Sequence, residues 1–288
     1  MGSITQERMS LNDVKSPYSR VDLFRAVSEQ VRRDTIETVD ANVAEVHPKV
    51  SFYSKYGKRM LDILISFLAL LVTLPFNLMI GIITFFDVGR PIFFRQERIG
   101  KDCKTFSLVK FRNMTNATDK NGNLLPPSER VTKFGYFVRK SSLDELLNFW
   151  SIFKGDMSLI GPRPLEAVYL NRYNKRHIQR TAVRPGLECP LIHATEKKIT
   201  WYEQFENDIY YVENVSFLLD VKMMWSLVKM IFNRKSSAMR GASVRGGFIG
   251  YDFNGQTINA MDVPTKYVTA ALADLQSEFA DTTAATKT

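Results

Sequence analysis

A long apolar run from Met60 to Phe86, MLDILISFLALLVTLPFNLMIGIITFF, constrains this chain more than any other feature of its sequence. The run is about 27 residues long, and a helix needs roughly 20 apolar residues to cross a bilayer. It starts too far from the first residue to be a cleavable signal peptide. We therefore expect it to enter a membrane, and we keep a bent re-entrant helix, a straight crossing and a buried core helix as alternatives.

The charges on both sides of this run favour the re-entrant alternative. The basic residues before it are Lys55, Lys58 and Arg59, and those after it are Arg90, Arg95, Arg98 and Lys101. Basic residues beside membrane segments are retained on the cytoplasmic side. A helix that crosses once cannot place both flanks there, whereas a helix that turns and leaves by the same face can.

Pro75 lies near the middle of the run, where it predicts a bend. Proline removes one backbone donor, and its ring clashes with the carbonyl four residues earlier. Thr73 and Asn77 are placed to satisfy the freed backbone groups, which hydrocarbon would leave unpaired. The sequence thus predicts a bent re-entrant membrane helix over residues 51–90 that holds a cytoplasmic domain against the membrane.

Composition narrows the class of protein further. With 288 residues and 45% hydrophobic content, the chain can form a substantial core. The net charge of +9 favours a polyanionic partner, which includes nucleic acid, an anionic bilayer surface and a phosphorylated substrate. Cys103 and Cys189 are far apart and share no ligand-like spacing with the three histidines, so we expect neither a zinc site nor a disulfide framework.

Four segments are predicted along the chain. Residues 1–50 are polar, with helical spacing at Leu23, Val27 and Val31, and are interpreted as an appendage. The membrane helix follows over residues 51–90, the main α+β domain over residues 91–235, and a peripheral tail over residues 236–288. The main domain starts with IFFRQERIGKDCKTFSLVKFRNM, in which two short apolar runs around a turn predict a hairpin.

The stretch SFLLDVKMMWSLVKMIFNRK predicts a second amphipathic helix. Its apolar residues at helical spacing are Leu218, Val221, Trp225, Val228 and Phe232. This pattern fits both an interfacial helix with a basic face and a core helix.

Two adjacent carboxylates in RKSSLDELLNFW, Asp144 and Glu145, have two interpretations. Ser142 followed three residues later by Glu145 is a capping box, so both acids can simply mark the start of a helix. They can also perform chemistry, and this stretch alone does not decide between the two interpretations.

A second candidate site element is the loop GDMSLIGPRPLE. Pro162 and Pro164 stiffen the backbone around Arg163, whose guanidinium fork suits a phosphate or diphosphate. Further cations lie on nearby segments: Lys110, Arg112, Arg130, Arg139 and Lys140. A nucleic-acid-binding function rests on net charge alone, since the chain has no helix-turn-helix, Walker or GxGxxG signature.

Six motifs in order, QERIG, KFRNM, RVTKFGYFVRKSSLDELLN, GDMSLIGPRP, RPG and DIYYVENVSFLLD, resemble those of the bacterial sugar transferase family, the monotopic phosphoglycosyl transferases. The resemblance covers roughly residues 52–235. It implies an enzyme on the cytoplasmic face of the bacterial inner membrane that moves a sugar 1-phosphate from a UDP-sugar to a polyprenol phosphate such as undecaprenyl phosphate, and releases UMP. That step initiates synthesis of exopolysaccharide, capsule, O-antigen or glycoconjugates.

The resemblance also implies residue roles. Asp144 matches the nucleophile that forms a covalent phosphosugar intermediate, and Glu145 matches its partner; together they are expected to bind Mg²⁺. A carboxylate near a helix N-terminus is held ionised by the helix dipole, which is compatible with this role of Asp144. Basic residues of the family motifs match Lys110, Arg139 and Arg163. These three and the nearby Arg112 are expected to bind substrate phosphates, with Pro162 and Pro164 shaping the loop. Pro75 matches the proline that bends the family's membrane helix. We expect a UDP-sugar, polyprenol phosphate and the membrane as partners, no nucleic acid, and a possible homo-oligomer.

Two departures from the family pattern leave an alternative open. LDELLN stands where many members have LDELPQ, and PGLECPLIHATE stands where PGITGLAQVNGR is common. In the second segment Glu196 replaces an arginine. The role of that arginine passes to Lys197 or Lys198, or is absent. The alternative is a catalytically silent membrane scaffold that binds nucleotide sugar or a lipid phosphate.

Overall fold

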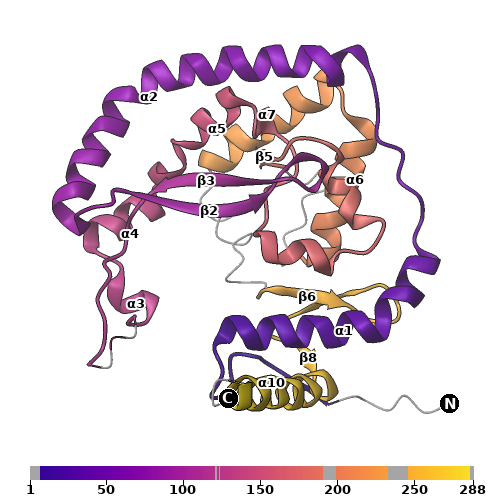
Figure 1. The fold of residues 1–288 in the computed structure, drawn as a ribbon. Helices are drawn as coiled ribbons and strands as arrows, with labels where there is room; N and C mark the ends of the chain where they lie inside the picture. The colour runs from indigo at the N-terminus through magenta and orange to yellow at the C-terminus, as the bar shows by residue number, and fades with distance from the viewer. Residues whose placement is uncertain (1–6, 121, 123, 191–198, 233–245, 286–288) are drawn as a thin grey trace. The chain divides into compact units, whose positions relative to one another are not determined.

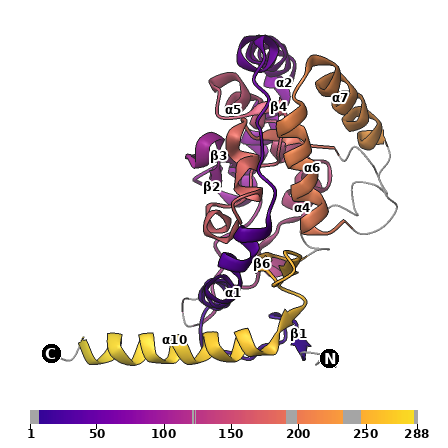
Figure 2. The same ribbon diagram turned by 90° about the vertical axis from the view of Figure 1, so that its right-hand side faces the viewer.

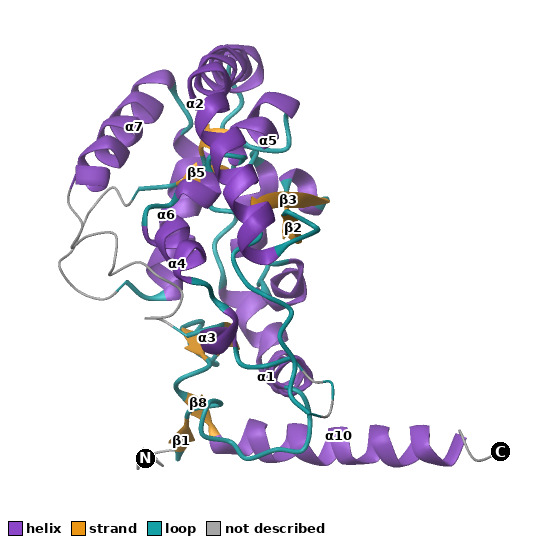
Figure 3. Ribbon diagram, turned by 90° about the vertical axis from the view of Figure 1, so that its left-hand side faces the viewer, coloured by secondary structure: helices purple, strands orange, loops and turns teal. Residues whose placement is uncertain are grey.

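The structure is a computed structural model that describes residues 7–120, 122, 124–190, 199–232 and 246–285. These residues form a mixed helical and β structure, which confirms the predicted α+β class. Helices and loops dominate, and each sheet among the described residues has two strands (Figure 3). The chain divides into two compact units: unit 1 is Met1–Lys49, Val168–Arg180 and Cys189–Thr288, and unit 2 is Val50–Ala167 and Thr181–Glu188.

Unit 1 combines segments from both ends of the chain with parts of its middle. Its helices are α1 (Arg20–Asn42), α6 (Trp201–Asn214), α7 (Phe217–Phe232) and α10 (Thr265–Ala285). Its antiparallel strand pairs are β1 (Arg8–Met9) with β8 (Val263–Pro264), and β6 (Phe248–Tyr251) with β7 (Thr257–Asn259). Figure 2 shows α10 side-on as one unbroken helix that begins close to β1.

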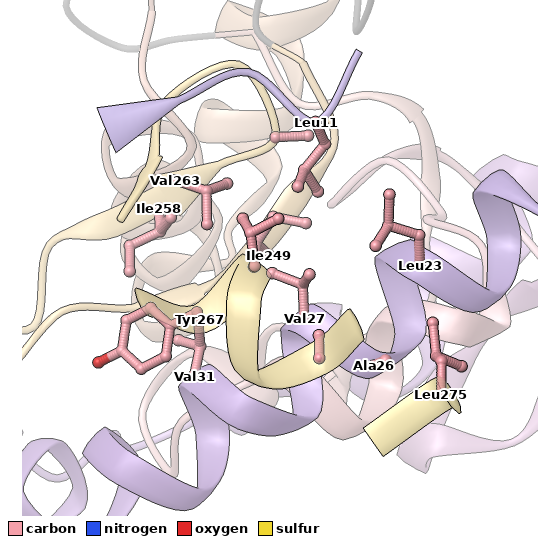
Figure 4. Packing of buried hydrophobic residues seen from close by; sticks show 13 residues of the cluster. Leu11, Leu23, Ala26, Val27, Val31, Ile249, Ile258, Val263, Tyr267 and Leu275 are labelled. Atoms are coloured by element: carbon pink, nitrogen blue, oxygen red, sulfur yellow. The ribbon is translucent and has the colours of Figure 1, made fainter. Parts of the chain in front are cut away.

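The core of unit 1 joins α1 to the C-terminal segment. Figure 4 shows Leu23, Val27 and Val31 of α1 gathered with Ile249 and Leu275, and all five side chains are buried. The sequence predicts a separate appendage over 1–50 and a separate tail over 236–288; the structure instead packs the described parts of the two together. Each segment carries only a narrow apolar stripe, and its partner lies at the other end of the chain. Residues 236–245 lie outside the described residues.

The exposure of the side chains of α7 distinguishes the two alternatives for residues 217–232, an interfacial helix and a core helix. Leu218, Val221 and Trp225 are exposed, and only Met223 on the opposite side is fully buried among its large apolar residues with described side chains. The side chain of Phe232 lies outside the described part of the chain. The exposed face favours an interfacial helix over a core helix.

Unit 2 contains the predicted hairpin, which is confirmed. Strands β2 (Phe93–Ile99) and β3 (Thr105–Phe111) pair antiparallel around the short turn Lys101–Cys103. The other elements are a short helix α3 (Pro127–Arg130), α4 (Lys133–Lys140), the 3₁₀ turn η3 (Leu143–Glu145), α5 (Asn148–Lys154), and strands β4 (Ser158–Ile160) and β5 (Gly186–Glu188). Strands β4 and β5 pair in parallel, and this pair brings the GPRP loop beside the RPG segment.

Helix α2 (Lys58–Val88) continues a π-helical turn over Tyr53–Gly57. Within the described ranges, Tyr53–Val88 is the only helical stretch long and apolar enough to cross a membrane. Most of its large apolar side chains are exposed, which contradicts the core-helix alternative. The helix curves along its length in Figure 1 and contains Pro75, in agreement with the predicted bend.

Thr73 and Asn77 were both expected to bond backbone groups beside Pro75, but only Thr73 bonds a backbone carbonyl. The Thr73 hydroxyl donates to the carbonyl of Ala69 at 2.7 Å, and the Asn77 amide donates to the Thr73 hydroxyl at 3.3 Å. The Asn77 amide therefore donates to the Thr73 side chain, and not to a backbone carbonyl as expected. A hydroxyl that bonds the carbonyl four residues earlier also promotes bending of a helix.

Candidate active site

The two adjacent carboxylates lie in a tight connection between α4 and α5. Ser142 has left-handed backbone angles, with φ of 56°, and Leu143–Glu145 form a single 3₁₀ turn. The predicted capping box is wrong: the Ser142 side chain makes no capping hydrogen bond, and α5 begins only at Asn148. The helix-dipole argument for an ionised Asp144 therefore does not apply, because no helix of useful length starts at this position.

Lys110 comes from the end of β3 and contacts both carboxylates. Its Nζ lies 3.9 Å from Asp144 Oδ2 and 3.4 Å from Glu145 Oε1. The side chains of Lys110 and Asp144 are only 20% and 11% exposed. Charges that are this far removed from water interact more strongly than a surface pair.

Arg163 comes from the GPRP loop and contacts Glu145. Its Nη2 donates to Glu145 Oε1 at 2.6 Å, while its Nη1 donates to the carbonyl of Leu187 at 2.9 Å and lies 3.6 Å from Glu188 Oε2. Its side chain remains 45% exposed. One edge of the guanidinium is thus held by acidic and carbonyl oxygens, while much of the side chain stays open to a ligand.

The loop around Arg163 is held by a close backbone approach. Pro162 and Pro164 are buried, and the Pro162 carbonyl accepts from the backbone N–H of Gly186 at 3.1 Å. A Cβ added at Gly186 would lie 2.2 Å from the nitrogen of Gly161, so only glycine allows this contact. The glycine pair therefore sets the position of Arg163 relative to the RPG segment.

The environment separates the pKa values of the two acids. Burial raises the pKa of the Asp144 carboxyl above its ordinary value, and the nearby charge of Lys110 offsets this only in part. Burial acts on Glu145 in the same direction, but Arg163 and Lys110 outweigh it and lower its pKa. Glu145 is thus a fixed anion that holds the two cations, whereas Asp144 is the more basic carboxylate of the two.

The remaining predicted cations lie in different places. Arg139 is exposed in the last turn of α4, and its charge lowers the pKa of Asp144 without a direct contact. Arg112 donates to the carbonyls of Val88 and Arg90 and so holds the C-terminal end of α2. The hydrogen bonds of Arg112 thus lie at the end of α2, and its expected role in phosphate binding stays a prediction.

Other expected cations also have local roles. Arg130 donates to the carbonyl of Leu125, and Lys140 lies over the ring of Tyr136. Glu196, Lys197 and Lys198 lie outside the described residues.

Sequence reasoning missed Glu188 as a site residue. It follows the RPG segment at the end of β5 and lies beside Arg163. The departure of PGLECPL from the usual family pattern was the available signal, but the pairing depends on the parallel contact between β4 and β5.

The polar residues at the start of α2 have structural partners. Arg59 donates to the carbonyls of Ile152 at 2.6 Å and Phe153 at 2.8 Å. Asp62 Oδ1 accepts from the Ser158 hydroxyl and from the backbone N–H of Leu159, both at 3.0 Å. These contacts join α2 to α5 and β4, and through β4 to the loop that carries Arg163.

Comparison with known proteins gives consistent matches. The bacterial sugar transferase family matches residues 53–234. A Bacillus subtilis (strain 168) protein named "Uncharacterized sugar transferase EpsL" is 39% identical over 174 residues, which is 60% of this chain and 86% of that protein. The core of unit 1 shown in Figure 4 lies entirely outside the matched residues.

Two further relatives have names that state a reaction. The UDP-N-acetylgalactosamine-undecaprenyl-phosphate N-acetylgalactosaminephosphotransferase of Aeromonas hydrophila is 32% identical over 186 residues, 60% of this chain and 43% of that protein. The UDP-glucose:undecaprenyl-phosphate glucose-1-phosphate transferase of Klebsiella pneumoniae is 33% identical over 196 residues, 62% of this chain and 41% of that protein. The chain therefore spans less than half the length of these two relatives.

Proposed function

Because the chain belongs to the bacterial sugar transferase family, we propose that it transfers a sugar 1-phosphate from a UDP-sugar to a polyprenol phosphate and releases UMP. The names of two relatives describe such a transfer to undecaprenyl phosphate. The observation that carries the proposal is the buried Asp144 carboxylate beside Lys110, next to a Glu145 that is paired with Arg163.

In the first step an oxygen of the ionised Asp144 carboxylate attacks the β-phosphorus of the donor. The bond from that phosphorus to the bridging oxygen breaks, UMP leaves with the electron pair, and Asp144 carries the phosphosugar as an acyl phosphate. In the second step a phosphate oxygen of the acceptor attacks the same phosphorus. The product is a polyprenol diphosphate sugar, and the Asp144 carboxylate is released unchanged.

Two features support Asp144 as the nucleophile. Burial removes water from its carboxylate, so less solvation is lost when an oxygen attacks phosphorus. Lys110 keeps a population of this carboxylate ionised despite burial, because its positive charge lowers the pKa.

The attack of an anion on a diphosphate requires positive charge at the reacting groups. Lys110 and Arg163 supply it from two sides, and the exposed Arg139 supplies a third cation near Asp144. Glu145 positions Lys110 and Arg163 through its Oε1 oxygen.

The donor set fits Mg²⁺. Within the described residues no group of three or more His, Cys, Asp and Glu side chains gathers to form a metal cage. Mg²⁺ does not require one, since it is commonly held by one or two carboxylates, substrate phosphates and water. Asp144 and Glu145 would hold it, and the bound ion would neutralise charge on the diphosphate.

For location, we propose the cytoplasmic face of the bacterial inner membrane, with α2 as a re-entrant helix. The basic flanks on both sides of α2 and its exposed apolar surface support this topology. Cysteines introduced at residues 55 and 95, one in each flank, should react with a membrane-impermeant reagent from the same side. Labelling of the two flanks from opposite sides would instead establish a straight crossing.

The test of the activity uses purified protein with a panel of UDP-sugars, undecaprenyl phosphate and Mg²⁺. We expect UMP release by the natural chain, loss of release in Asp144→Asn, and retention in Asp102→Asn, a matched control at an exposed position of the β2–β3 turn. Full activity of Asp144→Asn in folded, membrane-bound protein would refute the nucleophile role. Binding of a UDP-sugar without any UMP release by the natural chain would support the scaffold alternative.

A further inference from the structure

A large apolar groove, here called the α2 groove, lies on unit 2 beside the candidate active site. Its volume is about 1030 Å³. It is formed by one face of the C-terminal half of α2, the segment leading into β2, the end of β3 and the start of α5: Asn77, Leu78, Gly81, Ile82, Phe85, Phe86, Arg90, Pro91, Ile92, Phe93, Phe111 and Leu147. Figure 1 shows α2 arching over the hairpin that supplies the other wall.

The groove adjoins the candidate active site at the end formed by Phe111 and Leu147. Phe93 pairs with Phe111, whose rings are 5.7 Å apart, and the next pair along the strands is Phe94 with Lys110. Adjacent strand residues point to opposite faces, so Lys110 lies on the face of β3 opposite to Phe111, where its Nζ is 3.9 Å from Asp144 Oδ2. On the other side, Leu147 follows Glu145 by a single intervening residue. Phe111 packs in one apolar cluster with Leu143, Leu146 and Leu147, and Leu143 and Leu146 flank the two carboxylates in the chain. This end of the groove therefore lies beside the turn that carries Asp144.

The side chains that line the groove indicate which kind of ligand it can bind. Arg90 is the only charged side chain among the described residues that line the groove, and no carboxylate lines it. Such walls stabilise a long hydrocarbon and leave the hydroxyls of a nucleotide sugar without partners. The single positive charge suits an amphiphile with an anionic head.

We infer that the α2 groove binds the isoprenoid chain of the polyprenol phosphate acceptor, with its phosphate directed toward Lys110 and Asp144. This inference rests on the proposed function, which supplies the identity of the acceptor. Two relatives are named as transferases that use undecaprenyl phosphate, a ligand that combines a long apolar chain with a phosphate. The inference assigns the groove to the acceptor alone, so blocking the groove should affect only the second step.

Gly81 offers a direct way to fill the groove. A Cβ added there would lie 3.6 Å from Phe111 Cε1 and 4.0 Å from Ile92 Cδ1, which are ordinary contact distances. A methyl group is therefore accommodated, and a larger side chain extends into the space between these walls. Ile83 lies two residues further along α2, is 37% exposed and does not line the groove, so Ile83→Phe is the matched control.

The decisive experiment compares Gly81→Phe, Ile83→Phe and the natural chain in lipid nanodiscs. UMP release without acceptor measures the first step as a stoichiometric burst, and turnover with undecaprenyl phosphate or farnesyl phosphate measures the second. We expect Gly81→Phe to keep the burst but to raise the KM for undecaprenyl phosphate roughly tenfold or more, because apolar carbons of the chain are no longer buried. Its preference for the long chain over farnesyl phosphate should fall by a similar factor, and Ile83→Phe should match the natural chain.

An unchanged KM and chain-length preference in a Gly81→Phe enzyme with a normal burst would overturn the inference. Absence of UMP release by the natural chain would count against the proposed function instead, so the two failures are distinguishable.

A second measurement uses the natural chain and so does not depend on whether a substituted protein folds. A benzophenone-bearing polyprenyl phosphate is cross-linked to the natural chain, and the labelled peptides are mapped. We expect labelling within residues 77–93 that undecaprenyl phosphate suppresses and phosphatidylglycerol at the same concentration does not. Labelling elsewhere, or equal suppression by phosphatidylglycerol, would show that the groove is not an acceptor site.

Discussion

Asp62 is a polar residue in an apolar helix, and replacing it tests how α2 supports the active site. It is 2% exposed, and its Oδ1 accepts from the Ser158 hydroxyl and the Leu159 N–H, each at 3.0 Å. Ser158 and Leu159 belong to β4, which leads directly into the loop that carries Arg163. Loss of the carboxylate should therefore destabilise unit 2 and displace the phosphate-binding loop.

The magnitude follows from the two hydrogen bonds. A hydrogen bond to a charged group contributes about 1.5–3 kcal/mol, and a buried donor left without a partner costs about 1–3 kcal/mol. Asp62→Ala should thus lower the free energy of unfolding by roughly 3–6 kcal/mol. Ser158→Ala removes one of the two bonds and should cost about half as much, and Asp62→Asn, which keeps an acceptor oxygen, should lie closest to the natural chain.

Thermal unfolding of the three variants in one detergent gives the order of stabilities. The Ser158→Ala change should have little further effect in the Asp62→Ala background, because its partner is already absent. An Asp62→Ala protein as stable as the natural chain, or additive effects of the two changes, would refute the reasoning.

Three further predictions follow from the site and from unit 1. Lys110→Met should move the acid limb of the pH profile of UMP release to higher pH, because Lys110 lowers the raised pKa of Asp144 and the carboxylate must be ionised to react. Gly186→Ala should destabilise the β4–β5 pair by roughly 2–4 kcal/mol, since its Cβ would lie 2.2 Å from the Gly161 nitrogen; thermal unfolding measures this. Glu206→Gln should reduce the loss of stability in acid, which chemical denaturation as a function of pH measures.

The sign of the Glu206 effect follows from its pKa. Burial alone raises this pKa, but hydrogen bonds from Arg176 and His177 outweigh burial and lower it to about 2. A lowered carboxylate pKa contributes stability above the unfolded value of 4.5, and this contribution is lost as the pH falls toward about 2. It amounts to roughly 2–3 kcal/mol, which the glutamine variant lacks at every pH.

Each of these predictions has a control. Lys154→Met removes an exposed lysine that pairs with Asp156 and should leave the pH profile unchanged. Gly122→Ala replaces a glycine whose added Cβ meets nothing within 4 Å, so its effect reports backbone strain at a positive φ without overlap. A Glu206→Gln protein that loses stability in acid as steeply as the natural chain would contradict the assignment.

Features governed by short-range patterning were predictable from the sequence. The membrane-length helix with its proline, the hairpin around Lys101–Cys103 and the helical spacing of Leu23, Val27 and Val31 all depend on residues close together in the chain. The order of motifs likewise indicated the family and the two adjacent carboxylates. Local periodicity and local turn chemistry are properties of a short peptide, so the sequence alone determined them.

Pairings between distant residues were decided only by the tertiary structure. The sequence offered Glu145 a role in a capping box, but in the fold it pairs with Lys110 and Arg163, because two cations stabilise a buried carboxylate more than one backbone N–H does. The two hydrogen bonds of Arg112 to carbonyls at the end of α2 likewise depend on the packing of β3 against that helix. The opposite pKa shifts of Asp144 and Glu145 have the same origin, since burial and partner charges exist only once separate segments of the chain have packed together.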